Sequence, residues 1–153
     1  MRRTDRQITE RAQIDEIIWK SRVCRMGLVC DGEPYVVPLC FGYDGAAVYL
    51  HMATAGKKLD CLRANPRVCL EWDLLGDILP APEACGWGMA YESVIAFGMA
   101  QELTDEAAKH HALAQIMAQY AGEERAWSFR PEQLAHTVVV RVKLDEVTGK
   151  ARG

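Results

Sequence analysis

Residues 34–73 read PYVVPLCFGYDGAAVYLHMATAGKKLDCLRANPRVCLEWD, and this stretch decides the fold class. Residues 35–41 and 47–52 are rich in β-branched, aromatic and other apolar side chains, and a Tyr-Asp-Gly turn separates them, which predicts two strands. Small residues then lead into a short predicted helix over 57–64. An Asn-Pro pair ends this helix, because the residue before a proline disfavours helical backbone. Another apolar run over 67–73 predicts a further strand.

The flanking sequence adds strands and helices on both sides of this stretch. The first three predicted strands are joined by short connections, which favours an antiparallel meander at the start of the chain. Six predicted strands in total favour closure into a small barrel, which leaves few exposed edges. The fold class is therefore predicted to be α+β, mainly β. The further predicted elements are a helix over 10–20 with Thr9 as its cap, strands over 23–30, 91–103 (with a bulge at Gly98) and 137–144, a helix over 105–120 capped by Thr104, a helical turn from Pro131, and a loop over 74–90.

Composition narrows the class of protein. A length of 153 residues predicts one domain spanning 1–153. The formal net charge of −3 argues against a nucleic-acid partner, which normally requires a basic surface. No apolar run is long enough for a membrane span, and the polar N-terminus lacks the apolar segment of a signal peptide. We therefore expect a cytoplasmic protein with no membrane or nucleic-acid partner.

The six cysteines show no close pairing along the sequence. None forms a Cys-x-x-Cys pair, and four of them (Cys24, Cys30, Cys40 and Cys69) lie in predicted strands. Free cysteines of this kind usually behave as small buried apolar residues. The sequence therefore predicts neither a disulfide framework nor a metal site.

The pair Lys57-Lys58 opens the predicted helix over 57–64. A helix N-terminus already carries partial positive charge, so two lysines there are unfavourable unless an anion binds beside them. The preceding Ala-Thr-Ala-Gly turn allows backbone N–H groups and the Thr54 hydroxyl to approach such an anion. We therefore expect a phosphate group at this turn. The alternative is a solvated lysine pair on a surface helix.

Pro38 lies in the middle of the predicted strand over 35–41. Proline cannot donate to a ladder, which places this strand at an edge or an opening of the sheet, where a flat apolar ring system has room to bind. The alternative is that Pro38 marks a bulge.

The order of these motifs resembles the pyridoxamine 5′-phosphate oxidase-like flavoproteins, and within them the nitroimidazole-resistance subgroup. The quoted stretch carries most of the resemblance, and RRTDRQIT, VCRMGLV, YESVIAFGMA and VVVRVKLDEVTGK extend it over nearly the whole chain. The resemblance implies a six-stranded antiparallel split β-barrel with flanking helices, a homodimer, and FMN bound at the subunit interface.

Matching the motifs residue by residue implies a set of site residues. His51 lies where relatives place a histidine close to the flavin, which suggests a catalytic role in contacting substrate or transferring protons, whereas the alternative is a packing histidine. Trp87 and Tyr91 are expected to cover the flavin from the second subunit, beside the substrate. The resemblance assigns the flavin to Val36, Val37, Pro38, Phe41, Leu50, His51, Met52, Ala53 and Thr54, and the FMN phosphate to Lys57 and Lys58.

The resemblance implies an FMN-dependent oxidoreductase acting on small electron-poor substrates, in particular nitroimidazoles or other nitroaromatics. The C-terminal arginine-containing extension of true pyridoxamine 5′-phosphate oxidases is not evident, so vitamin B6 oxidation is not expected. Two alternatives remain open: a non-catalytic flavin- or haem-binding protein, since split barrels host several cofactors, and a reductase that uses the deazaflavin F420.

Overall fold

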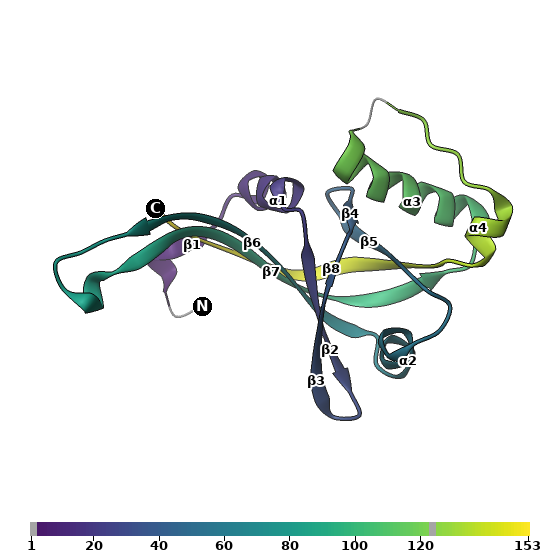
Figure 1. Cartoon of the computed structure of the whole chain (residues 1–153), viewed down its shortest axis with the longest axis horizontal. Helices are drawn as coiled ribbons and strands as arrows, with labels where there is room; N and C mark the ends of the chain where they lie inside the picture. Colours follow the sequence, from purple (N-terminus) through teal and green to yellow (C-terminus); the bar gives the residue numbers. More distant parts are fainter. Residues whose placement is uncertain (1–2, 123–124) are drawn as a thin grey trace.

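An antiparallel sheet of eight strands dominates the computed structural model, which describes residues 3–122 and 125–153 (Figure 1). Four α-helices and two short 3-10 helices accompany it in this part of the chain. The elements in order are η1 (Thr4–Arg6), β1 (Gln7–Ile8), α1 (Arg11–Lys20), β2 (Cys24–Cys30), β3 (Glu33–Leu39), β4 (Gly42–Tyr43), β5 (Ala47–Met52), α2 (Lys57–Ala64), β6 (Arg67–Leu79), η2 (Ala84–Gly86), β7 (Gly88–Leu103), α3 (Glu106–Ala121), α4 (Pro131–Ala135) and β8 (Val138–Arg152).

The sheet is an open, split barrel. Its strand order is β3-β2-β6-β7-β8-β5-β4, and β1 pairs with β8. The mainly antiparallel split barrel was predicted correctly, whereas the count of six strands was too low because β1 and β4 are only two residues long. The predicted meander was wrong in one pairing, since β5 lies against β4 and β8 rather than β3. β3 ends the sheet, so Pro38 lies on an edge strand as predicted.

Strands β6 and β7 form a long ribbon that projects from the body as an arm (Figure 1). They pair from Arg67 opposite Met99 as far as Leu79 opposite Gly88, with a register shift between Leu75 and Ile78. The predicted loop over 74–90 was therefore wrong. Its glycines and prolines suggested irregular structure, but only the tip turns, and β8 extends alongside β7 to support the ribbon. The predicted irregularity at Gly98 is confirmed by a register shift between Phe97 and Gly98.

The helices begin close to the predicted residues, with different caps. Helix α1 buries Ile14, Ile17 and Ile18 against the sheet. Its N-cap is Glu10 rather than the predicted Thr9, and the Glu10 side chain makes no capping hydrogen bond. At α3 the Asp105 carboxylate, rather than Thr104, accepts a hydrogen bond from the Ala108 amide at 2.8 Å. None of the helices in the described ranges has the length and hydropathy needed to traverse a bilayer.

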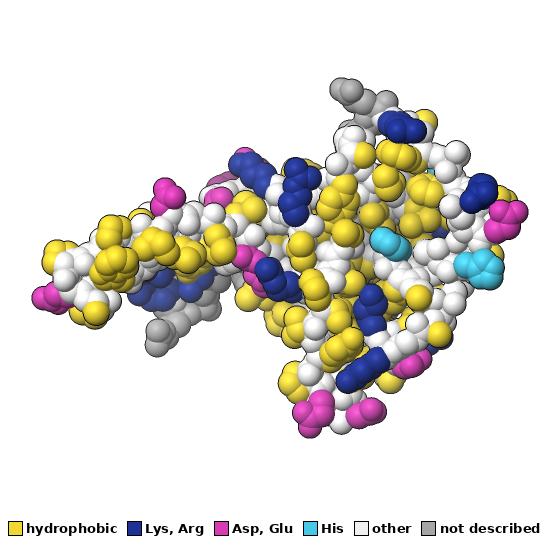
Figure 2. Space-filling view, viewed as in Figure 1, with side chains coloured by type: hydrophobic (Ala, Val, Ile, Leu, Met, Phe, Trp, Pro, Cys, Tyr) yellow, Lys and Arg dark blue, Asp and Glu magenta, His cyan; other side chains and the backbone are white. Residues whose placement is uncertain are grey.

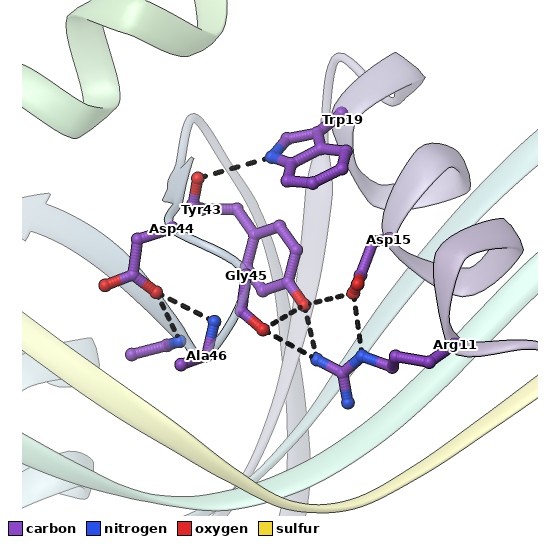
Figure 3. Close-up of polar contacts among 8 residues, drawn as sticks. Arg11, Asp15, Trp19, Tyr43, Asp44, Gly45 and Ala46 are labelled. Atoms are coloured by element: carbon purple, nitrogen blue, oxygen red, sulfur yellow. Dashed lines mark hydrogen bonds and ion pairs between the residues drawn. The ribbon is translucent and has the colours of Figure 1, made fainter.

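A polar network fastens α1 to the β4–β5 turn (Figure 3). The Tyr43 hydroxyl donates to the Asp15 carboxylate at 2.6 Å and lies 2.6 Å from the Arg11 guanidinium, which also donates to the Gly45 carbonyl. Burial, followed by the hydrogen bond to Asp15, raises the pKa of Tyr43, so the phenol stays protonated. The Trp19 indole N–H completes the set by donating to the Tyr43 carbonyl at 3.4 Å. This network is structural because it joins helix and turn.

Helix α3 packs on the other side of β4, at Gly42. A Cβ on Gly42 would lie 2.5 Å from the α3 backbone at Gln115 and Ile116, so only glycine allows this close approach. The Tyr120 hydroxyl at the end of α3 accepts a hydrogen bond from the Phe41 amide and donates to the Arg22 carbonyl, both at 3.0 Å. Helix α3 therefore fixes the end of the sheet where β4 and β5 lie.

The cysteine prediction was wrong for one pair. Cys30 and Cys61 form a disulfide, with Cα atoms 5.1 Å apart, within the usual range for this bond. They are 31 residues apart in sequence and meet because α2 docks on the end of β2, which residue spacing does not reveal. Cys24 is buried, as expected for a free cysteine, whereas Cys40 and Cys85 are exposed.

Candidate functional site

A hollow of about 250 Å³ lies at the start of α2, where the sequence predicted an anion site. Gly56 precedes the helix with φ 127° and ψ 160°, a conformation essentially restricted to glycine, and its missing side chain leaves open space. The first amides of a helix have no intrahelical acceptor, and Gly56 offers no side chain to cap them. The hollow is lined by Tyr35, Met52, Ala53, Ala55, Gly56, Lys57, Lys58 and Leu59.

The two lysines lie in this hollow without an acidic partner. Lys57 places its Nζ 4.8 Å from the centroid of the Tyr35 ring, a cation–π contact that holds the ammonium against β3. Burial lowers the pKa of Lys58. Among residues 3–122 and 125–153, neither lysine forms an ion pair, whereas Arg25 and Arg67 of the sheet and Arg63 of α2 do. The hollow therefore combines two ammonium groups with the N-terminal end of a helix, and none of its lining residues is acidic.

His51 lies on β5, close to this positive charge. Burial, and next the charge of Lys58, lower the pKa of His51, so its imidazole is neutral near pH 7. The side chain nevertheless remains exposed. A neutral, accessible imidazole can both accept and donate a proton, which is the behaviour expected of a histidine beside a reacting group rather than one packed in a core.

The remaining predicted flavin residues divide between the core and the surface. Phe41 and Leu50 are fully buried, and Phe41 packs edge-on against Trp72 with ring centroids 5.8 Å apart. Their side chains therefore belong to the core of this chain. Val37 packs against the same core, while Val36 is 62% exposed. The alternation of β3 explains this, since successive side chains point to opposite faces.

Of the predicted set, the structure brings together Met52, Ala53, Lys57 and Lys58 around the hollow, with His51 nearby. Thr54 and Pro38 are exposed and do not line it. The sequence missed Tyr35 and Leu59, whereas Ala55 and Gly56 belong to the turn that was predicted to admit the anion. Tyr35 had no local signal, because its contact with Lys57 depends on how the β2–β3 hairpin meets α2. The positive φ of Gly56 was signalled only by the run of small residues before the helix.

An apolar groove of about 270 Å³ lies beside the hollow and shares Tyr35 with it. Val36, Gly27, Cys69 and Phe97 occupy one row across β3, β2, β6 and β7, and Gly27 leaves the middle of that row without a side chain. Large apolar side chains are exposed on this part of the sheet, and Figure 2 shows apolar atoms over the body and along the arm. On the body part of these four strands the exposed members are Val29, Val36, Ile95, Phe97 and Met99, and Leu75, Ile78 and Met89 follow on the arm.

Trp87 and Tyr91 lie in the arm. Trp87 follows η2 at the tip and is 56% exposed, and Tyr91 pairs with Leu75 further along the ribbon, with Lys150 over its ring at 5.9 Å. The tip projects to the opposite side of the body from α2 (Figure 1). The structure therefore does not bring these two residues to the hollow of the same chain.

Comparison with known proteins agrees with this architecture. The pyridoxamine 5′-phosphate oxidase family model matches residues 10–151. A Bacteroides thetaiotaomicron protein provisionally assigned to 5-nitroimidazole antibiotic resistance is 31% identical, with 95% of this chain and 86% of that chain covered and a TM-score of 0.85. A FAD-binding protein from Mesorhizobium loti is 26% identical, covers 97% and 98% of the two chains, and superposes with a TM-score of 0.71.

A further solved structure shares the fold at lower identity. The flavocytochrome Anf3 from Azotobacter vinelandii is 24% identical, with 100% of this chain and 72% of that chain covered and a TM-score of 0.88. Flavins are therefore bound by relatives of this fold. With the family model covering nearly the whole length and the split barrel in place, the chain belongs to the pyridoxamine 5′-phosphate oxidase family.

Proposed function

We propose that this protein is a homodimeric FMN-dependent oxidoreductase of small electron-poor compounds, nitroimidazoles and other nitroaromatics among them. The observation that carries the proposal is the hollow at the start of α2, which Lys57 and Lys58 line without an acidic partner in the described chain, at the N-terminus of a helix that has no side-chain cap. A phosphate ester supplies the missing negative charge at a helix N-terminus. Both the size of the hollow and its donor set fit the phosphate of a flavin mononucleotide.

The residues around the hollow have distinct roles in this proposal. Lys57, held by Tyr35, and the half-buried Lys58 bind the phosphate, and Gly56 lets it approach the helix amides. His51 stays neutral and holds a proton at its imidazole for transfer to a substrate heteroatom. When bound, the flavin supplies the electron transfer, and the protein contributes position and electrostatics.

The proposed dimer places the apolar outer face of β2, β3, β6 and β7 against a second copy. Soluble monomers rarely expose a continuous apolar surface of this kind. The arm adds exposed Leu75, Ile78, Trp87 and Met89, which a partner subunit would cover. In such a dimer the arm of one copy extends over the flavin of the other, so Trp87 and Tyr91 border the partner's substrate.

Similarity to the Bacteroides protein supports nitroimidazoles as the substrate class. That protein is related over 95% of this chain at 31% identity. Reduction of a nitro group takes up both electrons and protons. In this proposal the flavin supplies the electrons and the histidine beside it transfers the protons. The FAD-binding protein at 26% identity makes FAD the natural competitor for the cofactor site.

Flavin binding is tested first, with purified protein. We expect either a flavin absorption spectrum on isolation or quenching of FMN fluorescence on titration, saturating at one FMN per chain. FAD and F420 are titrated in parallel, and weaker binding than FMN is expected for both. A protein that stays colourless and leaves FMN fluorescence unchanged contradicts the proposal. A Soret band on addition of haemin, without flavin binding, favours the haem alternative.

Reductase activity is tested on the FMN-loaded protein. After chemical reduction without oxygen, addition of a 5-nitroimidazole should restore the oxidised flavin spectrum within minutes. His51→Gln should slow this step while leaving FMN affinity unchanged, because the imidazole is assigned to the substrate. Equal rates in both proteins would remove His51 from the proposal.

A further inference from the structure

The two walls of the phosphate hollow come from different elements. The β2–β3 hairpin contributes Tyr35, and α2 contributes Lys57 and Lys58. The cation–π contact between Lys57 and Tyr35 crosses the boundary between them. The hollow therefore keeps its shape only while the hairpin and the helix stay in contact.

The Cys30–Cys61 disulfide joins these same two elements. Cys30 ends β2 at the tip of the hairpin, opposite Glu33, and Cys61 lies one turn beyond the lysines on α2. Apart from this bond, α2 is held by the burial of Leu59 and Leu62 in the core, by the contact of Lys57 with Tyr35, and by an ion pair of Arg63 with Glu102 on β7. That ion pair ties the helix to β7 and does not join it to the hairpin. An eight-residue helix is too short to be stable without such tertiary contacts.

We propose that the Cys30–Cys61 disulfide is a redox-controlled clasp that sets the affinity of the α2 hollow for the flavin phosphate. The inference rests on the proposed function, because it concerns the same site. With the bond formed, helix and hairpin are fixed and the lysines are preorganised for the phosphate. With the bond broken, α2 gains conformational freedom. The entropy lost when the phosphate orders the helix again then weakens binding.

Reduction follows ordinary thiol–disulfide exchange with a dithiol reductant. A thiolate of the reductant attacks Sγ of Cys30, which is more exposed than Cys61, and the sulfur of Cys61 leaves and takes up a proton. The second thiol of the reductant then displaces Cys30 and forms the oxidised cyclic disulfide. Two electrons and two protons pass to the protein, and two cysteine thiols result.

The state of the bond is measured by counting thiols in denaturant. Of six cysteines, two are in the disulfide and four are free, so four thiols should react in the oxidised protein, isolated without reductant, and six after reduction. Peptide mapping should identify Cys30 and Cys61 as the linked pair. Six reactive thiols in the oxidised sample, or a different linked pair, overturn the inference.

The effect on the site is measured by titrating oxidised and reduced wild-type protein with FMN, the reductant having been removed without oxygen. We expect the dissociation constant to rise on the order of fivefold on reduction, from the lost preorganisation, with faster amide hydrogen exchange in α2. Cys30→Ser should match the reduced protein in both conditions. Cys85→Ser, which changes a free cysteine in η2, should behave like wild type.

The outcomes separate the clasp from the proposed function. Equal FMN affinity in the oxidised and reduced proteins overturns the clasp and leaves FMN binding intact. Absence of FMN binding in both states overturns the proposed function and the clasp with it. The wild-type comparison decides the question even where Cys30→Ser fails to fold.

Discussion

The β6–β7 ribbon differs sharply between its two halves. Near the body, Val68, Leu70 and Trp72 of β6 alternate with outward-facing residues and are fully buried. Beyond residue 74 the same strand exposes Leu75 and Ile78, at 70% and 53%. The hydrogen-bonded ladder continues through both halves. The first half is therefore stabilised within one chain, whereas the second half has apolar surface to offer a partner.

The largest expected effect is on the free energy of unfolding, which should depend on the half of the ribbon in which a leucine is truncated. Leu70→Ala removes a fully buried side chain and should lower the free energy of unfolding by about 2–5 kcal/mol, from lost burial and the cavity left behind. Leu75→Ala, in the same strand, should change it by less than about 0.5 kcal/mol in the monomer. Urea unfolding at low protein concentration measures both. A similar loss in the two variants would contradict the comparison.

The next effect concerns association through the arm. Leu75→Asp should weaken the proposed dimer on the order of a hundredfold, because an unpaired carboxylate would be buried against the partner. Sedimentation velocity over a concentration series measures the dimer dissociation constant. Ala107→Asp, on the exposed first turn of α3, is the control and should leave association unchanged. A wild-type protein that remains monomeric over the whole concentration series would contradict the proposal that the arm contacts a second copy.

The hollow gives a smaller effect at Gly56. Gly56→Ala forces a side chain into a conformation with φ 127°, which should cost about 1–3 kcal/mol and displace the start of α2. Both thermal stability and FMN affinity should fall. Gly45→Ala imposes comparable strain at φ 88° in the β4–β5 turn and should lower stability with little change in FMN affinity. Parallel losses of affinity would show that the effect is not local.

The smallest effect is on the titration of His51. Its pKa should lie below the usual value, because burial and the charge of Lys58 both disfavour the imidazolium. As pH falls through the unfolded pKa towards the lower folded one, the unfolded state binds the proton first, so this residue's contribution to stability declines with acidification. NMR titration should show a partial upward shift in Lys58→Ala and a smaller one in Lys57→Ala. A downward shift in Lys58→Ala would contradict the assigned cause.

Much of the fold could be predicted because periodicity reports burial. The burial of Ile14, Ile17 and Ile18 and the boundaries of α2 and β5 follow from local patterns. The arm could not be predicted in this way. Its strands lack a buried face within one chain, so they have no alternation to detect, and the exposed apolar residues with Gly and Pro resemble a loop.

The candidate site was predictable only in part, for a similar reason. The misplaced charge of Lys57 and Lys58 is a local signal, and the hollow forms where they lie. Tyr35 and the Cys30–Cys61 pair depend on how the hairpin meets α2, which no short stretch encodes. The strand positions of Phe41 and Leu50 matched the family pattern, but only the structure shows which face each occupies.

If Lys57 and Lys58 hold the phosphate of FMN, the protein must distinguish FMN from riboflavin, which has the same ring system and lacks that phosphate. Wild-type protein should bind FMN at least tenfold more tightly than riboflavin, since charge-assisted bonds to a phosphate contribute about 1.5–3 kcal/mol each. The double variant Lys57→Ala/Lys58→Ala should lose most of that preference while riboflavin binding stays nearly unchanged, and Lys20→Ala should keep it. A double variant that still prefers FMN as strongly as wild type would place the phosphate elsewhere and exclude these two lysines as its ligands.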